Sequence, residues 1–218
     1  MKNPPTEKPE SRFIPDGVFE EDLSLDIINT KKYRNKAVFL DRDGTINVER
    51  GYILNPNDIE LNPSTGQAMR ILNELNILTI VITNQAAIDK RLLSLEQFEK
   101  INGKLWEDLS GMGAHYDVLY YCPHSPEITP DCHCRKPNPG LILQAAKDFD
   151  IDLASSFMVG DKLTDIEAGR LSGCKTILLL SGHGEKAYKN LGDYHGTPPD
   201  FICQNLGEAV TWLLPHIL

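Results

Sequence analysis

From residue 36 onwards, apolar residues occur in two patterns that alternate along the chain. Short runs in which nearly every residue is apolar, such as 37–40 and 78–82, are typical of strands buried on both faces of a sheet. Longer segments place apolar residues three or four positions apart, as at Ala68, Ile71 and Leu72, which predicts amphipathic helices. These patterns predict strands at 37–40, 78–82, 116–121, 157–160, 176–180 and 201–203, and helices at 64–75, 94–109, 140–149, 163–171 and 207–214.

The alternation of strands and helices predicts an α/β fold: a Rossmann-like, doubly wound, mainly parallel sheet with helices on both faces. No large cap domain fits between these elements, so residues 34–218 are predicted to form one domain. Residues 1–33 are polar and contain four prolines. They predict an N-terminal extension outside the core that is partly mobile, with a possible short helix at 19–28.

Composition and charge exclude some functions. The net charge of −9 argues against nucleic acid as a partner, because no basic face large enough to follow a phosphate backbone is evident. The apolar runs are too short to span a bilayer, and the N-terminus lacks the apolar stretch of a secretory signal. We therefore expect a cytoplasmic protein with no membrane partner, and a monomer.

Two carboxylates, Asp41 and Asp43, follow the first predicted strand directly, and Gly44 comes next. Such a sequence can be a simple turn, or it can pair a carboxylate nucleophile with a carboxylate acid/base around a metal ion. A calcium loop is excluded. Counted from Asp41, the sixth position holds Ile46 instead of the required glycine, and the twelfth holds Tyr52 instead of the required glutamate.

Further polar side chains follow other predicted strands. Thr83 and Asn84 come after the second strand, and Asp161 and Lys162 come after the fourth. Each pair alone could be a turn or a helix cap. Because ligands of open α/β sheets bind at the carboxyl ends of the strands, we expect these groups to meet in one site. Oxygen ligands beside a lysine such as Lys136 suit Mg²⁺ and a phosphoryl group.

Four short motifs carry a resemblance to a known family. The chain resembles the haloacid dehalogenase superfamily of phosphatases. Within that superfamily it is similar to the enzymes that act on D-glycero-D-manno-heptose 1,7-bisphosphate and to the related histidinol-phosphate phosphatases. The similarity covers residues 37–214, and the motifs are 41–45, 83–85, 135–137 and 160–162.

The resemblance implies a role for each motif residue. Asp41 would be the nucleophile, Asp43 the general acid/base, and Thr83 and Lys136 would stabilise the transferring phosphoryl group. Asp41, Asp43 and Asp161 would hold a catalytic Mg²⁺. Asp165 would support the site. The implied contacts to a small phosphorylated sugar are Glu49, Arg50, Gly51, Tyr52, Asn84, Gln85, Ala86, Arg135 and Lys162.

Three cysteines and two histidines lie within thirteen residues, at 122–134, and four such ligands in a short loop suit tetrahedral zinc. The alternative is a loop without metal. The family resemblance implies Cys122, His124, Cys132 and Cys134 as the zinc ligands, with His133 as a possible substitute. A closed four-ligand site is structural, and this one would aim Arg135 and Lys136 at the phosphate. The cluster at 122–134 therefore predicts a short zinc-binding loop beside the active site.

The chain departs from the heptose-bisphosphate phosphatases directly after Gln85. Those enzymes have Ser-Gly-Ile-Ala-Arg-Gly, whereas this chain has Ala-Ala-Ile-Asp-Lys-Arg at 86–91. The change puts the substrate in question, although Lys90 and Arg91 could still meet a second phosphate. The leading hypothesis is Mg²⁺-dependent removal of the 7-phosphate of the heptose bisphosphate, via an aspartyl-phosphate, in cell-surface heptose synthesis (a lipopolysaccharide precursor or related glycan). The alternatives are a phosphatase of histidinol phosphate or another small phosphomonoester, and a non-catalytic zinc-stabilised binding module.

Overall fold

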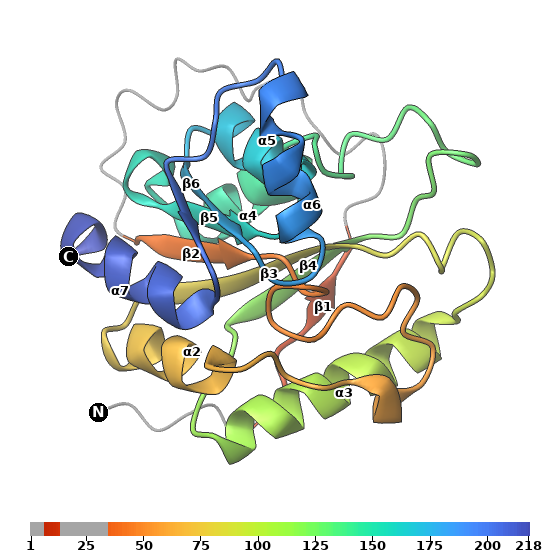
Figure 1. Ribbon diagram of the computed structural model, residues 1–218. Helices are drawn as coiled ribbons and strands as arrows, with labels where there is room; N and C mark the ends of the chain where they lie inside the picture. Colours follow the sequence, from red (N-terminus) through yellow and green to blue (C-terminus); the bar gives the residue numbers. More distant parts are fainter. Residues whose placement is uncertain (1–6, 14–34) are drawn as a thin grey trace.

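The computed structural model describes residues 7–13 and 35–218. Within them, seven parallel strands form one sheet in the order β1–β4–β3–β2–β5–β6–β7 (Figure 1). The strands are β1 (Ser11–Arg12), β2 (Ala37–Leu40), β3 (Leu78–Asn84), β4 (Val118–Cys122), β5 (Phe157–Gly160), β6 (Lys175–Leu179) and β7 (Phe201–Cys203).

Helices cover both faces of this sheet. On one face lie α2 (Thr65–Glu74), α3 (Leu95–Gly111) and α7 (Leu206–Ile217); on the other lie α4 (Gly140–Phe149) and α5 (Leu163–Leu171) (Figure 1). A short helix, α6 (Gly184–Lys189), follows β6. Three 3-10 turns complete the described elements: Pro56–Asp58, Leu153–Ser155 and Leu191–Asp193. The predicted doubly wound α/β fold is confirmed.

The central strand β2 is completely buried, as its run of apolar residues predicts. It pairs with β3 on one side and with β5 on the other. The chain winds outward from β2 through β3 to β4 and returns to begin again at β5. This reversal next to β2 is the switch point where doubly wound sheets bind ligands. It places Asp41 and Asp161, which end adjacent strands, side by side.

Local sequence signals determine where helix α3 begins and which of its faces is buried. Ser94 caps α3 by accepting a hydrogen bond from the backbone N–H of Gln97, and Gln97 accepts one from the N–H of Ser94. This capping box was evident in the sequence. Phe98, Ile101 and Leu105 then face the sheet at helical spacing and are fully buried. One face of α3 is thereby packed against the sheet, in the core cluster that also contains residues of β3 and β4.

One boundary prediction was wrong. The sequence predicts that residues 1–33 lie outside the core, but Ser11 and Arg12 form the edge strand β1 beside β4, and Phe13 packs on the core. A strand of two polar residues has no apolar period, so the sequence does not indicate it. Lys8 pairs with Glu99 on α3, and Arg12 with Asp148 on α4, which ties this segment to both helical layers. The short helix predicted at 19–28 lies outside the described residues.

The six-residue helix α6 was also missed, because it is too short for helical periodicity to register. Among the described elements, none of the helices has both the length and the apolar character that crossing a membrane requires.

Candidate active site

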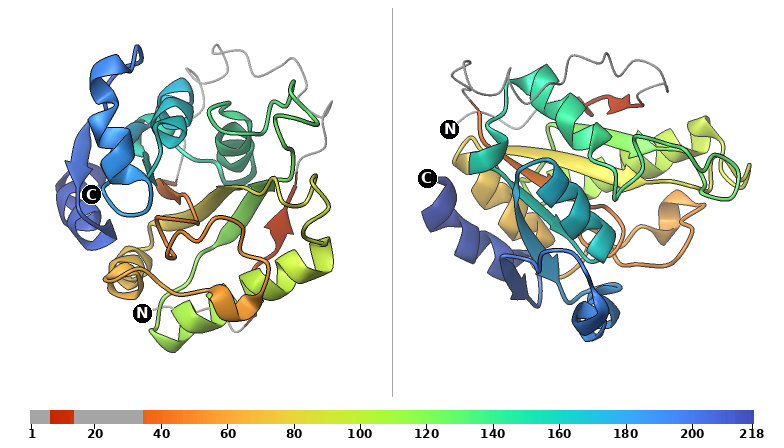
Figure 2. Two further views of the ribbon diagram at one scale, coloured as in Figure 1. Left: turned by 45° about the vertical axis from the view of Figure 1, so that its right-hand side comes forward. Right: turned by 90° about the horizontal axis from the view of Figure 1, so that it is seen from above.

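The loops that follow β2, β3 and β4 gather at one end of the sheet (Figure 2). There Lys136, from the loop after β4, lies buried among three oxygens. Its Nζ is 2.7 Å from Asp41 Oδ1, 2.7 Å from Asp165 Oδ1 and 2.7 Å from the carbonyl oxygen of Ile82. Burial alone would lower the pKa of Lys136, but Asp165 and Asp41 outweigh it and raise that pKa. The site therefore contains a fixed positive charge beside Asp41.

Asn84 sets the position of this lysine. Its amide donates to the carbonyl of Lys136 at 3.1 Å and accepts from the N–H of the same residue at 3.1 Å. Both polar atoms of the side chain are thus engaged with the backbone of Lys136. The implied role of Asn84 as a substrate contact stays a prediction, whereas its structural role in joining β3 to the lysine loop is direct.

Asp43 is held by three side chains. The guanidinium of Arg42 donates to both carboxylate oxygens, at 3.1 and 2.9 Å, and Asn47 donates to Oδ1 at 3.0 Å. Gln85 donates to Asp43 Oδ2 at 2.9 Å and to the hydroxyl of Thr83 at 2.8 Å. Burial would raise the pKa of Asp43, but the charge and hydrogen bonds of Arg42, with those of Asn47 and Gln85, lower it overall. Asp43 is therefore ionised in the free protein.

Asp161, at the end of β5, is fully buried. Its Oδ2 accepts a hydrogen bond from the N–H of His183 at 2.7 Å, while its Oδ1 accepts none from the residues that the structure describes; Lys162 Nζ lies 3.7 Å from it. Gly44 and Gly182 enclose this carboxylate. A Cβ atom on either glycine would lie 2.2 or 2.3 Å from Asp161 Oδ2, and both have positive φ angles.

Three carboxylates could hold a metal ion here. One oxygen each of Asp41, Asp161 and Asp165 lies within 4.8 Å of the others. Burial first, and then the charges of Asp41 and Asp165, raise the pKa of Asp161 to about 8. A buried carboxylate oxygen without a hydrogen-bond partner, next to other carboxylates, is suited to a hard cation such as Mg²⁺. Two of the implied magnesium ligands, Asp41 and Asp161, therefore lie together in a set that suits the ion, and the third carboxylate of this set is Asp165 instead of the implied Asp43.

The raised pKa of Asp161 predicts a dependence of stability on pH in the metal-free protein. Between the ordinary aspartate pKa of 3.8 and about 8, the folded state binds a proton that the unfolded state has released. The stability that this proton supplies is fully present below the lower value and is lost as the pH rises through about 8. Without Mg²⁺, the free energy of unfolding should fall between about pH 5 and pH 8 by at least about 1.4 kcal/mol, the equivalent of one pKa unit.

Chemical denaturation of the wild-type protein and of Asp161→Asn checks this dependence. The variant has no proton to lose at this position, so its stability should fall less over the same pH range. Equal slopes for the two proteins would show that Asp161 ionises at its ordinary pKa.

The pocket at this site is small. It encloses about 40 Å³ and is lined by Asp41, Asp43, Thr83, Asn84, Lys136, Lys162, Thr164 and Asp165. Pockets that enclose a whole small molecule measure roughly 300–1,000 Å³. The pocket therefore fits a single small group such as a phosphoryl group, and the rest of a substrate would lie against the surrounding loops.

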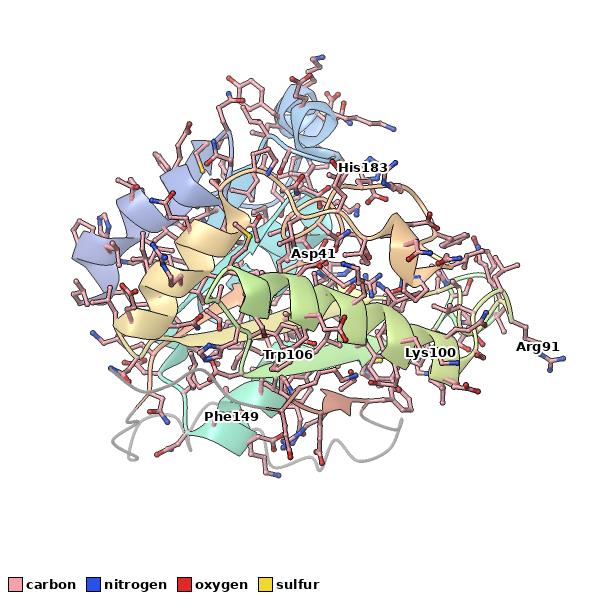
Figure 3. The ribbon with its side chains drawn as sticks, turned by 90° about the horizontal axis from the view of Figure 1, so that it is seen from below. Asp41, Arg91, Lys100, Trp106, Phe149 and His183 are labelled. Carbon is pink, nitrogen blue, oxygen red and sulfur yellow. The ribbon has the colours of Figure 1, made fainter. Side chains whose placement is uncertain are left out.

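Those loops contain the other implied substrate contacts. Glu49 Oε2 lies 3.1 Å from Lys162 Nζ and 3.3 Å from His183 Nε2, so it joins two basic groups at the mouth. Arg50 pairs with Glu60, and the exposed ring of Tyr52 lies 5.8 Å from Lys90 Nζ. Gly51 has a positive φ angle, which turns this loop, and Ala86 is buried behind Gln85. Figure 3 shows Asp41 within the fold, and His183 lies just before α6, where its backbone N–H binds Asp161.

A second candidate metal centre lies in the loop after β4. The ligand atoms of Cys122, His124, Cys132 and Cys134 all lie within 4.8 Å of one another. The Sγ atoms of Cys122 and Cys132 are 3.5 Å apart, and those of Cys132 and Cys134 are 3.0 Å apart. Thiolates bound to one tetrahedral zinc at about 2.3 Å would be about 3.8 Å apart. The donor set fits zinc, and His133 is exposed outside this group.

One cysteine of this group, Cys122, has a lowered pKa and so ionises readily to the thiolate. A hydrogen bond from Cys134, against the effect of burial, lowers the pKa of Cys122 to about 6. A thiolate near neutral pH is what a metal requires. The loop is also tied to the active site. Arg135 donates to the carbonyl of His124 at 2.9 Å, so its guanidinium braces the loop, and the next residue is Lys136.

Sequence reasoning missed some residues of the site. His183 follows β6 and Thr164 lies in the first turn of α5, so both lie beyond the carboxyl ends of strands, where doubly wound sheets bind ligands. Asp165, expected to support the site, does so through Lys136 but also lines the pocket. Arg42 lies inside the 41–45 motif and pairs with its neighbour Asp43, but its contacts with Asn102 and Phe98 depend on the tertiary fold.

Comparison with known proteins agrees with the fold and with the family resemblance noted in the sequence. A family model described as HAD-hydrolase-like matches residues 133–209. A relative from Helicobacter pylori strain J99, D-glycero-beta-D-manno-heptose-1,7-bisphosphate 7-phosphatase, is 40% identical over 181 residues, which cover 82% of this chain and 97% of the relative. A relative from Thermosynechococcus vestitus, D-glycero-D-manno-heptose-1,7-bisphosphate 7-phosphatase, is 39% identical, covering 83% of this chain and 96% of the relative.

A solved structure adds the ligands. The D,D-heptose 1,7-bisphosphate phosphatase from B. bronchiseptica, in complex with magnesium and phosphate, matches with a TM-score of 0.76 and 30% identity, covering 83% of this chain and 98% of that one. The resemblance noted in the sequence is thus confirmed. The chain belongs to the haloacid dehalogenase-like phosphatases that these relatives represent, and it is a phosphoric monoester hydrolase.

Proposed function

We propose that the protein removes the 7-phosphate of D-glycero-D-manno-heptose 1,7-bisphosphate through an aspartyl-phosphate on Asp41, in cell-surface heptose synthesis. The observation that carries the proposal is the position of Asp41. Its carboxylate lies at the switch point of the sheet, in a pocket of phosphoryl size, 2.7 Å from the ammonium of Lys136. The names of the relatives support the choice of substrate.

In the first step a carboxylate oxygen of Asp41 attacks phosphorus, and the bond from phosphorus to the sugar oxygen breaks. Lys136 and the hydroxyl of Thr83 stabilise the charge on the phosphoryl oxygens. Asp43 gives a proton to the leaving oxygen. In the second step Asp43 takes a proton from water as the water oxygen attacks phosphorus, and the bond from phosphorus to the Asp41 oxygen breaks, which releases phosphate.

The lowered pKa of Asp43 has a consequence for this sequence of steps. Asp43 is ionised in the free protein and must acquire a proton before it can act as an acid. A phosphate dianion that enters the pocket adds negative charge beside Asp43 and raises its pKa. Proton uptake would therefore accompany binding of the substrate.

Two metal ions have separate parts in the proposal. Asp41 and Asp161, with the backbone carbonyl of Asp43, would hold Mg²⁺, which when bound reduces the repulsion between the carboxylates and the phosphate. Cys122, His124, Cys132 and Cys134 would hold a structural zinc. With all four positions occupied by protein ligands, that zinc has no place for substrate, so its part is to shape the loop that leads to Lys136.

A substrate panel tests the proposal. Phosphate release should be measured with Mg²⁺ for both anomers of the heptose 1,7-bisphosphate, for fructose 1,6-bisphosphate and for histidinol phosphate. We expect kcat/KM to be at least about 100-fold higher for one heptose anomer than for histidinol phosphate, because the basic groups at the mouth can meet a second phosphate. A preference for histidinol phosphate would overturn the proposed substrate.

A further inference from the structure

Arg42 is a buried arginine that the proposed steps do not use. It is 1% exposed, and it lies between the site and α3. Its Nε and one terminal nitrogen bind the two oxygens of Asp43, while its other terminal nitrogen donates to Asn102 Oδ1 at 3.0 Å. The guanidinium also lies over the ring of Phe98, 5.7 Å from its centre. Each of the three guanidinium nitrogens thus has a hydrogen-bond partner, and its plane has an aromatic neighbour.

Asn102 is fully buried in the middle of α3, on the same helix face as the buried Phe98 and Leu105. Its amide nitrogen lies 3.4 Å from the hydroxyl of Ser11 in β1, so the amide oxygen faces Arg42. A buried Asn in a helix lowers stability unless its amide is hydrogen-bonded. Here the amide connects the edge strand, α3 and Arg42.

We propose that Asn102 is a positioning residue for the reaction: through Arg42 it holds the carboxylate of Asp43 at the orientation from which a proton reaches the leaving oxygen. The inference rests on the proposed function, in which Asp43 is the acid. Without the oxygen of Asn102, a buried guanidinium N–H loses its acceptor. Arg42 can then turn, and the carboxylate that it grips at two points turns with it.

The leaving group makes this role measurable. A sugar alkoxide is a poor leaving group and requires the proton from Asp43 as the bond to phosphorus breaks. The anion of p-nitrophenol is stable near neutral pH and leaves without that proton. A misplaced Asp43 should therefore slow phosphoryl transfer from an alkyl phosphate and leave transfer from an aryl phosphate nearly unchanged. General loss of structure would slow both.

The test compares kcat/KM of Asn102→Leu for the heptose bisphosphate and for p-nitrophenyl phosphate, with Mg²⁺ present. We expect a loss of about tenfold or more for the sugar substrate and of less than about twofold for the aryl phosphate. Arg42→Lys serves as a second variant in case Asn102→Leu does not fold. It keeps a buried charge beside Asp43 but lacks the fork that reaches Asn102, so it should show the same selective loss.

Asn73→Leu is the matched control. Asn73 lies on α2, where its amide bridges the hydroxyl of Thr79 and the N–H of His115, away from the pocket. Its loss should lower stability and leave the ratio of the two kcat/KM values unchanged.

Asp43→Asn separates the two possible failures. If Asp43→Asn slows both substrates equally, the role of Asp43 in the proposed function is wrong. If Asp43→Asn is selective for the sugar substrate but Asn102→Leu and Arg42→Lys are not, the positioning role of Asn102 is overturned. A selective loss in all three variants, with Asn73→Leu unselective, supports it.

Discussion

Asp41→Asn is expected to abolish turnover of the sugar bisphosphate, with kcat falling by about 10⁴-fold or more. The amide cannot form the phosphoryl bond that the first step requires. The neighbouring carboxylates do not replace it: Asp43 is held by the guanidinium of Arg42. Asp161 is enclosed by Gly44 and Gly182, and Asp165 contacts Lys136. Phosphate release in the presence of Mg²⁺ measures the effect. Asp41→Asn keeps the size of the side chain, so the fold should be retained.

Binding of phosphate gives the control for this variant. The lost negative charge removes repulsion against a phosphate dianion, so calorimetry should find phosphate bound at least as tightly as in the wild type. Asp148→Asn, on α4 and away from the pocket, should keep full activity. Activity of Asp41→Asn within tenfold of wild type would mean that another group, or a water molecule, attacks phosphorus.

The sequence allowed the fold and the centre of the site to be predicted because both follow from short-range patterns. The strands β2 and β5 are continuous apolar runs, and in a parallel sheet their carboxyl ends must lie at one edge. That Asp41 and Asp161 come close together is therefore a consequence of topology. This prediction requires no knowledge of side-chain contacts.

The contacts that orient the site could not be predicted in the same way. Asn84 looks like a residue that faces a substrate, but its amide is hydrogen-bonded to the backbone of Lys136, 52 residues away. Arg42 and Asn102 are 60 residues apart and carry no local signal of their pairing. The strand β1 also has no sequence signal, since its two residues are too few to show the apolar alternation of a strand. Such contacts depend on how the elements pack.

The altered loop after Gln85 illustrates the limit for specificity. Lys90 and Arg91 keep the positive charge that a second phosphate would need, but neither side chain is directed at the pocket. Lys90 pairs with Glu127 at 2.9 Å. Arg91 has a positive φ angle and extends from the tip of its loop, away from Asp41 (Figure 3). Lys162, at the mouth of the pocket, is better placed to meet a second phosphate than either of them.

Cys132→Ser is expected to lose zinc and activity together. Serine is a poor zinc ligand, and three remaining ligands in a short loop bind the metal much more weakly. The loop continues into Arg135 and Lys136, so its disorder would remove the ammonium from Asp41. We expect the purified variant to contain much less than one zinc per chain and kcat/KM to fall by about 100-fold or more. Metal analysis and phosphate release on the same preparation measure both effects.

Cys203→Ser is the matched control, since Cys203 is a buried cysteine in β7 whose thiol lies near the carbonyl of Asn205 and far along the sheet from the loop. It should keep its zinc and its activity, although a buried hydroxyl can lower its stability. Full activity in a Cys132→Ser protein shown to be free of zinc would refute the structural role of the metal. The hydrogen bonds of Asn84 would then be sufficient to hold Lys136, because they join the lysine to β3 independently of the cysteine loop.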